Sequence, residues 1–472
     1  MANKLVIAVV FAVVAVVVCE ARQELGVPPQ MRNECELDNL DALEPTDTIP
    51  CEAGRIEYWD HTHPQLRCAG VSVVRRVIQP GGLYLPTFHN APQITYVVQG
   101  RGLAGRVIPG CAETYMDSQG LGGEQGQQKF RDMHQKVEHV RHGDVFAWPS
   151  GTAHWCYNSG DQPLVTISLI DIANQHNQLD RNPRAFRLAG TNPKGSRGVG
   201  GGRGMQQEQN IFSGFDPQIL ADSYKISLQT AQQLQNQQDN RGNIVHVKGP
   251  FQVVRPPLRQ EYESEEWRQP RGQNGLEETF CSMRFHESID DPARADVYKP
   301  QLGRVTTVNS YTLPILQYVR LSATRGHING NAMVLPKWTM NANEILYCTG
   351  GQARIQVVND NGKNVLDKQL QKGQLVVIPQ GYAVVMRAQG NKFEWISLKT
   401  NDNAMVNTLA GRTSALRALP LEVIMNAYQI SQQEAWQIKF NTPETTLTHA
   451  GGRQQPQQMM MMEEIVEDLI QA

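Results

Sequence analysis

The residues best suited to chemistry in this chain lie in segments rich in Val and Ile and bounded by glycine. One such segment carries the pattern Gly143-x5-Pro149-x-Gly151-x2-His154-x3-Asn158. Imidazole nitrogens bind divalent Mn, Fe or Ni when carboxylates complete the ligand set. The pattern therefore raises the question of whether a metal centre is built around His154.

The partner half of such a centre would come from an earlier segment, which begins at Pro80-Gly81 and carries Thr87, His89 and Gln93. Together the two segments resemble the paired motifs of the cupin β-barrel superfamily. That resemblance implies a ligand set of three histidines and one glutamate, of which this chain retains only His89 and His154. Two histidines and a neutral Gln make a weak site. We therefore expect two structural barrel histidines and no metal cofactor.

A second copy of these positions occurs later in the chain and retains even fewer of the expected ligand residues. Its ligand positions read Lys337, Thr339 and Glu344, and Val384 stands where the second-motif histidine would be. A lone Glu beside a Lys cannot chelate a divalent cation well. We expect an ion pair or a solvated pair there, and no metal centre.

Other kinds of catalytic site are not supported by the sequence. It contains no Gly-x-Ser-x-Gly nucleophile elbow and no phosphate-binding Gly-x4-Gly-Lys-Ser/Thr loop. The glycine run at 198–204 misses the dinucleotide-binding spacing and reads as linker. Cys156 lies two residues from His154, on the same face of a strand, but we expect a buried, inert thiol.

The elements that position these residues are predicted to be short β-strands. Val, Ile and Thr dominate several segments that Gly or Pro bounds, which is typical of a sandwich or barrel. These segments are residues 71–78, 94–108 and 164–172, and then 315–323, 344–358, 374–379 and 393–400.

The two series of strands align as an internal duplication. Gly143–Gly151 matches Gly373–Gly381, and Leu85-Pro86 precedes the first long hairpin as Leu335-Pro336 precedes the second. Each half closes with one helical pattern, Tyr-x-Ile-Ser-x3-Ala. The fold class predicted is all-β with helical extensions: two tandem jelly-roll β-barrels, each followed by a small α-helical segment.

Composition and targeting signals restrict the compartment and the partners. The formal net charge of −2 shows no excess of basic residues, so no nucleic-acid partner is expected. Residues 1–21 are predicted to form a signal peptide. The sequence has no second long apolar run, so we expect no membrane span in the mature protein. Gln-rich clusters such as QQLQNQQ at 232–238 are typical of solvated segments or of a chain selected for nitrogen content.

A set of longer motifs resembles the 11S seed storage globulins, the legumin type of plant bicupin. These motifs are IPGCAETY at 108–115, DMHQKV at 132–137, NQLDRNPRAFRLAG at 177–190, NGLEETFC at 274–281 and DPARADVYKPQLGRVTTVNSYTLPIL at 291–316. The resemblance spans nearly the whole mature chain.

The resemblance implies a processing site and a disulfide framework. An asparaginyl endopeptidase would cut between Asn274 and Gly275, leaving an acidic and a basic chain. The inter-chain disulfide maps onto Cys111 and Cys281, and an intra-chain disulfide maps onto Cys35 and Cys68. Because Cys51 could compete with Cys35 for Cys68, the second pairing stays open from sequence alone, with Cys35 favoured.

Four divisions of the chain follow from these observations. We expect a signal peptide at 1–21, an N-terminal barrel with helices at 22–254, a disordered linker at 255–274 and a C-terminal barrel with helices at 275–472.

The function implied by the resemblance is a seed nitrogen reserve without catalytic activity. Such a protein is carried through the secretory pathway to the protein storage vacuole and mobilised at germination. It assembles with itself or with related globulin subunits into trimers and then hexamers. Two alternatives remain: a secreted metal-dependent bicupin enzyme of the oxalate-degrading type, and a vicilin-like ligand-binding bicupin.

Overall fold

The fold is described from a computed structural model. It covers residues 35, 37–108, 110–111, 115–116, 133–192, 209–236, 239–251, 253 and 281–451. The predicted signal peptide, the linker at 255–274 and the Asn274-Gly275 bond lie outside these residues. None of the helices in the described part of the chain has the length and apolar character that a membrane crossing needs.

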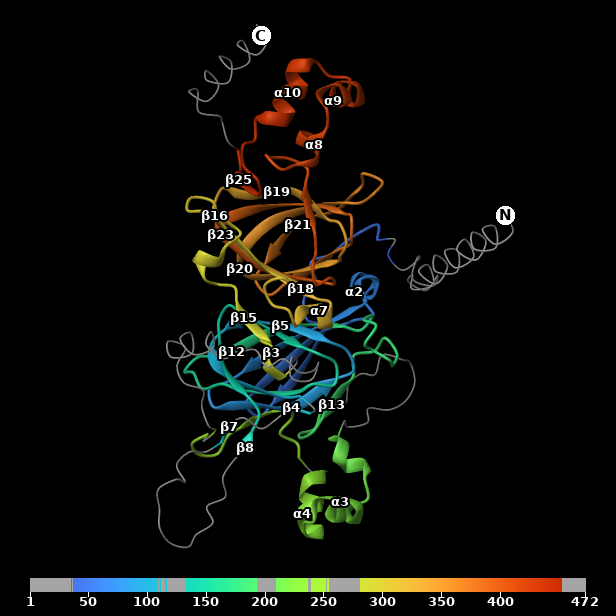
Figure 1. The fold of residues 1–472 in the computed structure, drawn as a ribbon, viewed down its shortest axis with the longest axis vertical. Helices are drawn as coiled ribbons and strands as arrows, with labels where there is room; N and C mark the ends of the chain where they lie inside the picture. The colour runs from blue at the N-terminus through green and yellow to red at the C-terminus, as the bar shows by residue number, and fades with distance from the viewer. Residues whose placement is uncertain are drawn as a thin grey trace, which may run out of the picture.

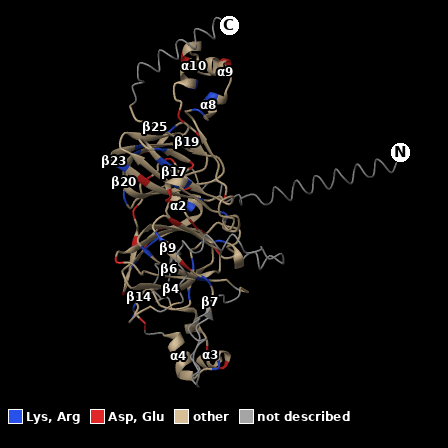
Figure 2. Cartoon of the chain, turned by 60° about the vertical axis from the view of Figure 1, so that its left-hand side comes forward, with Lys and Arg blue, Asp and Glu red and all other residues tan. Residues whose placement is uncertain are grey.

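Two β-barrels stacked along the long axis make up the molecule, and each carries a small group of helices at its outer end (Figure 1). The predicted fold class is confirmed. Lys and Arg lie interspersed with Asp and Glu over both barrels (Figure 2).

The first barrel closes from two antiparallel sheets, in the orders β1-β2-β3-β12-β5-β10-β15 and β13-β4-β11-β6-β9, with β14 paired to β4. A short ribbon of β7 and β8 lies outside these sheets. The strands are β1 Asp47–Cys51, β2 Gly54–Trp59, β3 Val71–Ile78, β4 Gly82–His89, β5 Gln93–Gln99, β6 Arg101–Val107, β7 Tyr115–Met116, β8 Met133–His134, β9 Val137–Arg141, β10 Asp144–Trp148, β11 Ala153–Tyr157, β12 Leu164–Asp171, β13 Ala185–Arg187, β14 Ile244–His246 and β15 His286–Ser288.

The second barrel is one connected set of ten antiparallel strands. They are β16 Val297–Lys299, β17 Gly303–Val308, β18 Ser322–Asn329, β19 Ala332–Thr339, β20 Glu344–Val358, β21 Asn364–Gln371, β22 Leu375–Ile378, β23 Ala383–Lys399, β24 Val406–Thr408 and β25 Leu447–His449.

The helical segments are short. With the first barrel go α2 Pro64–Ala69, η3 Ile211–Gly214, α3 Pro217–Tyr224 and α4 Leu228–Gln235. With the second go η4 Pro292–Arg294, α7 Leu316–Val319, α8 Ala415–Ala418, α9 Leu421–Tyr428 and α10 Gln432–Phe440.

Part of the predicted strand at 315–323 is wrong. The structure forms α7 at Leu316–Val319, and β18 begins only at Ser322. Leu316 and Val319 are both buried on the inner side of this single turn, which ends at Arg320 in the left-handed conformation. The apolar run is therefore a buried helical turn, which periodicity cannot distinguish from a short buried strand.

The duplication is visible in backbone conformation. Gly143 and Gly373 have φ of 89° and 92°, and each ends the turn that precedes its equivalent strand, β10 or β22. In the helical ends, Lys225 and Gln429 both have φ of 54°, and Ser227 and Ser431 each cap the next helix. The same local chemistry therefore builds both halves.

The barrels meet through a shared apolar core. Trp59, Tyr96, Phe285, Tyr347 and Leu398 belong to one buried cluster drawn from both barrels. Along β3, alternate side chains face in opposite directions, so one row enters this shared core and the other fills the first barrel. Both faces of that strand are therefore buried.

Each half also sends a segment into the other barrel. The strand β15, which follows the predicted linker, pairs with β10 of the first barrel. In the opposite direction, Leu43 exchanges backbone hydrogen bonds with Leu375 of the second barrel, at 2.7 and 3.0 Å. The two halves are therefore interlocked on both sides of the linker.

Candidate functional site

The first-barrel positions predicted from the cupin motifs come together in the barrel interior. His89 ends β4, Gln93 begins β5 and His154 lies on β11. All three side chains are buried. Nε2 of Gln93 lies 2.8 Å from Nδ1 of His89, and the two imidazole centroids are 6.1 Å apart. Thr87 turns back to donate to the carbonyl of Leu85.

Both imidazoles are held in the neutral form. Burial lowers the pKa of His154 to about 3, and the positive charge of Arg76 opposes its protonation further. Burial, followed by the same arginine, also lowers the pKa of His89 well below its usual value. His154 stacks on Trp148 with a centroid distance of 4.5 Å. These are packed barrel residues.

Arg76 is the residue in this interior that sequence reasoning missed. It lies on β3 with its side chain in the first barrel and is 5% exposed. Its Nη1 donates to Oγ of Ser168 at 2.7 Å, and its guanidinium lies over the ring of Tyr84. The sequence feature that could have revealed it is an arginine within an apolar strand, β3, at a position that faces the interior of the barrel.

This donor set does not fit a divalent metal. The structure groups nowhere, among the residues it describes, three or more His, Cys, Asp or Glu side chains that could hold one. The two histidines have a neutral amide and a cationic guanidinium beside them, whereas Mn, Fe or Ni would need anionic oxygen.

The equivalent interior of the second barrel contains a buried charge network. Nζ of Lys337 lies 3.2 Å from Oε1 of Glu344, and Oγ of Ser397 donates to the same oxygen at 2.6 Å. Thr339 lies 3.3 Å from the other carboxylate oxygen. Val384 is buried in the apolar core. The expected ion pair is present, and it is buried.

A second lysine, not anticipated from the sequence, completes this network. Lys399 is 2% exposed and donates to Thr324 at 3.1 Å. Burial lowers its pKa to about 8. Burial alone would raise the pKa of Glu344, but Lys337 and Lys399 outweigh it and lower that pKa to about 2. The carboxylate is committed to neutralising two lysines.

A cavity of about 860 Å³ lies between the two sheets of the first barrel. Arg76, Tyr84 and His89 line its inner part, and the segment from Asn182 to Arg187 forms one wall. We call this space the barrel cavity.

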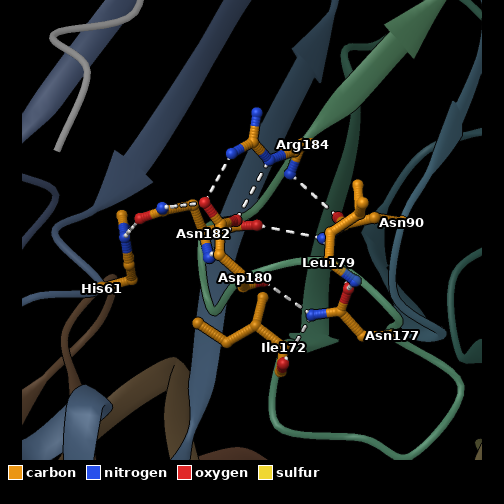
Figure 3. A network of polar contacts seen from close by, with 8 residues as sticks. All are labelled: His61, Asn90, Ile172, Asn177, Leu179, Asp180, Asn182 and Arg184. Carbon is orange, nitrogen blue, oxygen red and sulfur yellow. Dashed lines mark hydrogen bonds and ion pairs between the residues drawn. The ribbon is translucent and has the colours of Figure 1, made fainter. Parts of the chain in front are cut away.

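Polar contacts fix the wall of the barrel cavity (Figure 3). Asp180 accepts from Nε of Arg184 at 3.1 Å and from Nδ2 of Asn182 at 2.9 Å. Asn90 accepts from the backbone N–H of Arg184 and donates to the carbonyl of Asn182. His61, on the opposite side, lies 3.3 Å from Oδ1 of Asn182. The wall is therefore preformed.

Four of the cysteines that the structure describes form two disulfides. Cys111 is bonded to Cys281, which lies beyond the predicted linker, and Cys35 is bonded to Cys68. Cys51 is a free thiol in this structure, as are Cys156 and Cys348. Burial raises the pKa of Cys156 to about 12, so its thiol stays protonated and is a poor nucleophile.

Comparison with known proteins gives a consistent result. The cupin family matches residues 40–194 and 287–435, one segment in each half. The chain is 71% identical over 466 residues to cruciferin PGCRURSE5 of Raphanus sativus, covering 95% of this chain and 96% of that protein. It is 64% identical to the 12S seed storage protein CRC of Arabidopsis thaliana over the same shares.

Among solved structures, procruciferin, an 11S globulin from Brassica napus, superposes with a TM-score of 0.81 at 56% identity. The match covers 89% of this chain and 100% of that one.

Proposed function

Because this chain belongs to the cupin family, as one of its 11S seed storage globulins, we propose that it is a catalytically inert nitrogen reserve of the seed's protein storage vacuoles. The interlocking of the two halves carries this proposal. A reserve must keep its fold when its linker is cut, and this one has partners on both sides of that linker.

Processing is proposed at the bond between Asn274 and Gly275 by an asparaginyl endopeptidase. The acidic and basic chains would stay joined through Cys111–Cys281. The pairing of β15 with β10 would hold them even without that bond. Cys35–Cys68 would fasten the start of the acidic chain.

Assembly into trimers and then hexamers is proposed to use the helical ends. Ile219 and Tyr224 on α3, and Val423 and Tyr428 on α9, are each about half exposed although apolar or aromatic. Unpartnered apolar faces of this kind mark association surfaces. Their position at opposite ends of the protomer suits a closed head-to-tail ring.

The absence of catalysis is proposed on chemical grounds. In the first barrel two neutral histidines, His89 and His154, lie near the cation of Arg76. In the second barrel the carboxylate of Glu344 balances the charge of two lysines. Metal analysis of purified protein tests this. We expect Mn, Fe, Ni and Cu far below one per chain, whereas a stoichiometric metal lost from a His89→Ala, His154→Ala variant would favour the enzyme alternative.

The reserve role itself is tested in the plant. Quantitative immunoblots should show the protein accumulating during seed maturation and disappearing within the period of germination. A level that stays constant through germination would contradict the proposal.

A further inference from the structure

The sequence contains three Asn-Gly pairs, and two of them lie in the described part of the chain. One is the proposed processing bond after Asn274, and the other two are Asn329-Gly330 and Asn361-Gly362. An asparagine followed by glycine can modify itself, because glycine has no side chain to shield its backbone nitrogen from the neighbouring amide. The surroundings of each pair decide whether this reaction takes place in the folded protein.

Asn361-Gly362 lies at the tip of the hairpin that joins β20 to β21. Both residues are exposed, and the side chain of Asn361 makes no hydrogen bond to any residue that the structure describes. Gly362 has φ of 72°, and open space surrounds the position that a Cβ would occupy. Its N–H donates to the carbonyl of Asn359 at 3.1 Å, which closes the turn. The amide of Asn361 is therefore free to rotate toward a nitrogen that only the turn restrains.

Asn329-Gly330 has the same two residues but is held by its surroundings. Nδ2 of Asn329 donates to two backbone carbonyls, at 3.1 and 3.2 Å, and its Oδ1 lies 3.0 Å from Nε2 of His327. The N–H of Gly330 donates to the carbonyl of Asn391 at 2.7 Å. Both residues are half-buried. The two groups that would react are therefore engaged in other contacts.

We propose that Asn361 is a site of spontaneous deamidation in the folded protein and that Asn329 is protected from it. The backbone nitrogen of Gly362 gives up its proton to hydroxide and attacks Cγ of Asn361. The new bond closes a succinimide ring, and the side-chain nitrogen takes up a proton and leaves as ammonia. Water then opens the ring by breaking one of its two carbon–nitrogen bonds. Breaking the bond at Cγ gives aspartate, and breaking the bond at the backbone carbonyl gives isoaspartate.

Either product changes the tip of the hairpin. Both add a negative charge, and isoaspartate also adds a methylene to the backbone between Asn361 and Gly362, so the turn contact to Asn359 loses its geometry. The pairing of β20 with β21 begins at Val358 and Asn364, outside the turn. We therefore expect the barrel to stay folded while the modified form accumulates. The inference does not rest on the storage role, because the reaction needs only the folded chain and water.

Peptide mapping by mass spectrometry tests this site in the purified full-length protein incubated at neutral pH. We expect Asn361 to deamidate at least about tenfold faster than Asn329, since Asn329 must first be released from its contacts by local opening. Incubation in water enriched in heavy oxygen should label each product formed during the experiment. Absence of deamidation at Asn361, or equal rates at the two asparagines, would overturn the proposal.

Unfolding the chain separates the effect of the fold from that of the sequence. In guanidinium chloride at the same pH, the two pairs should deamidate at similar rates, because each asparagine precedes a glycine and neither keeps its contacts. An Asn329 that stays slow in the unfolded chain would show that its neighbours along the sequence protect it. That result would contradict the protection assigned to the fold.

Glutamine at each position provides matched variants. Asn361→Gln should suppress the acidic form that ion-exchange chromatography separates after incubation, because the longer side chain closes its ring much more slowly. The melting temperature should stay the same, since the side chain of Asn361 makes no hydrogen bond in the described part of the chain. Asn329→Gln should leave the rate at which the acidic form appears unchanged. An unaltered rate in Asn361→Gln would refute the site.

Discussion

Glu344 is the residue on which the interior of the second barrel depends. It is fully buried, contacts Lys337 and Ser397, and lies close enough to Lys399 for that charge to influence its pKa. The positions that the cupin resemblance assigns to metal ligands thus contain a charge network in this barrel, in which one carboxylate faces the ammonium groups of two lysines.

We expect Glu344→Gln to lower the free energy of unfolding by about 3–5 kcal/mol, because it leaves two buried ammonium groups without a carboxylate. Denaturant unfolding followed by fluorescence measures this loss. Glu394→Gln is the matched control, since Glu394 pairs with His327 at a partly exposed site and should cost less. Equal stability of Glu344→Gln and the unaltered protein would show that the network is not structural.

The buried histidines predict a dependence of stability on pH. The folded-state pKa of His154 is about 3 against an ordinary value of 6.5. The unfolded chain therefore binds protons that the folded chain does not as the pH falls below 6.5. The free energy of unfolding should fall with the pH, by up to about 1.4 kcal/mol per pH unit for each such histidine.

Denaturant unfolding at pH 6.5, 5.5 and 4.5 measures this slope. His154→Gln should flatten it, whereas His176→Gln, which changes an exposed histidine, should leave it unchanged. A slope that is the same in all three proteins would contradict burial of a neutral His154. Below pH 4.5, Glu344 adds its own loss, since the stability that its depressed pKa provides disappears as the pH falls toward about 2.

At the scale of elements, the exchanged segments decide what a cut in the linker can do. The strand β15 completes the sheet of the first barrel, and Leu40 and Leu43 attach the start of the acidic half to the second barrel through backbone hydrogen bonds to Val365 and Leu375. We therefore expect each barrel to stay whole without covalent continuity between the halves.

We expect cleaved Cys281→Ser protein to remain one particle in native buffer while giving two separate bands on a non-reducing denaturing gel. Size-exclusion chromatography with light scattering measures the native mass. The unaltered cleaved protein, which keeps its disulfide, is the control. Separation of the chains in native buffer would show that the disulfide, and not the exchanged segments, holds the halves together.

The elements were largely predictable because their signals are local. The segments 71–78 and 344–358 coincide with β3 and β20, since β-branched runs bounded by glycine specify buried strands. The turn α7 was missed because a short apolar run gives no period. The roles of Arg76 and Lys399 were missed because their contacts come from other strands of the barrel. The residues next to them in the sequence do not show what these contacts are.

At the scale of the whole molecule, the apolar helix faces at the two ends remain uncovered in a single protomer. Ile219 on α3 is 58% exposed and Ile438 on α10 is 43% exposed. In contrast, Leu220 and Ala231 are buried between the helices. The helices are therefore folded against one another, and Ile219 and Ile438 stay exposed on their outer side.

We expect Ile219→Glu to shift the protein from trimer to monomer, because a carboxylate would have to lose its hydration at the contact. Light scattering coupled to size exclusion gives the mass. Gln233→Glu adds the same charge at an exposed position of α4 and is the control. Trimers of unchanged stability in Ile219→Glu would place the contact elsewhere.

The central claim is that this globulin is cut after Asn274 and that Cys111–Cys281 joins the products. Gel electrophoresis of seed-extracted protein with and without reductant, followed by N-terminal sequencing of each band, tests it most directly. We predict one band without reductant and two with it, the smaller beginning Gly-Leu-Glu-Glu-Thr-Phe. A single band under both conditions, or a basic chain beginning elsewhere, would contradict the account.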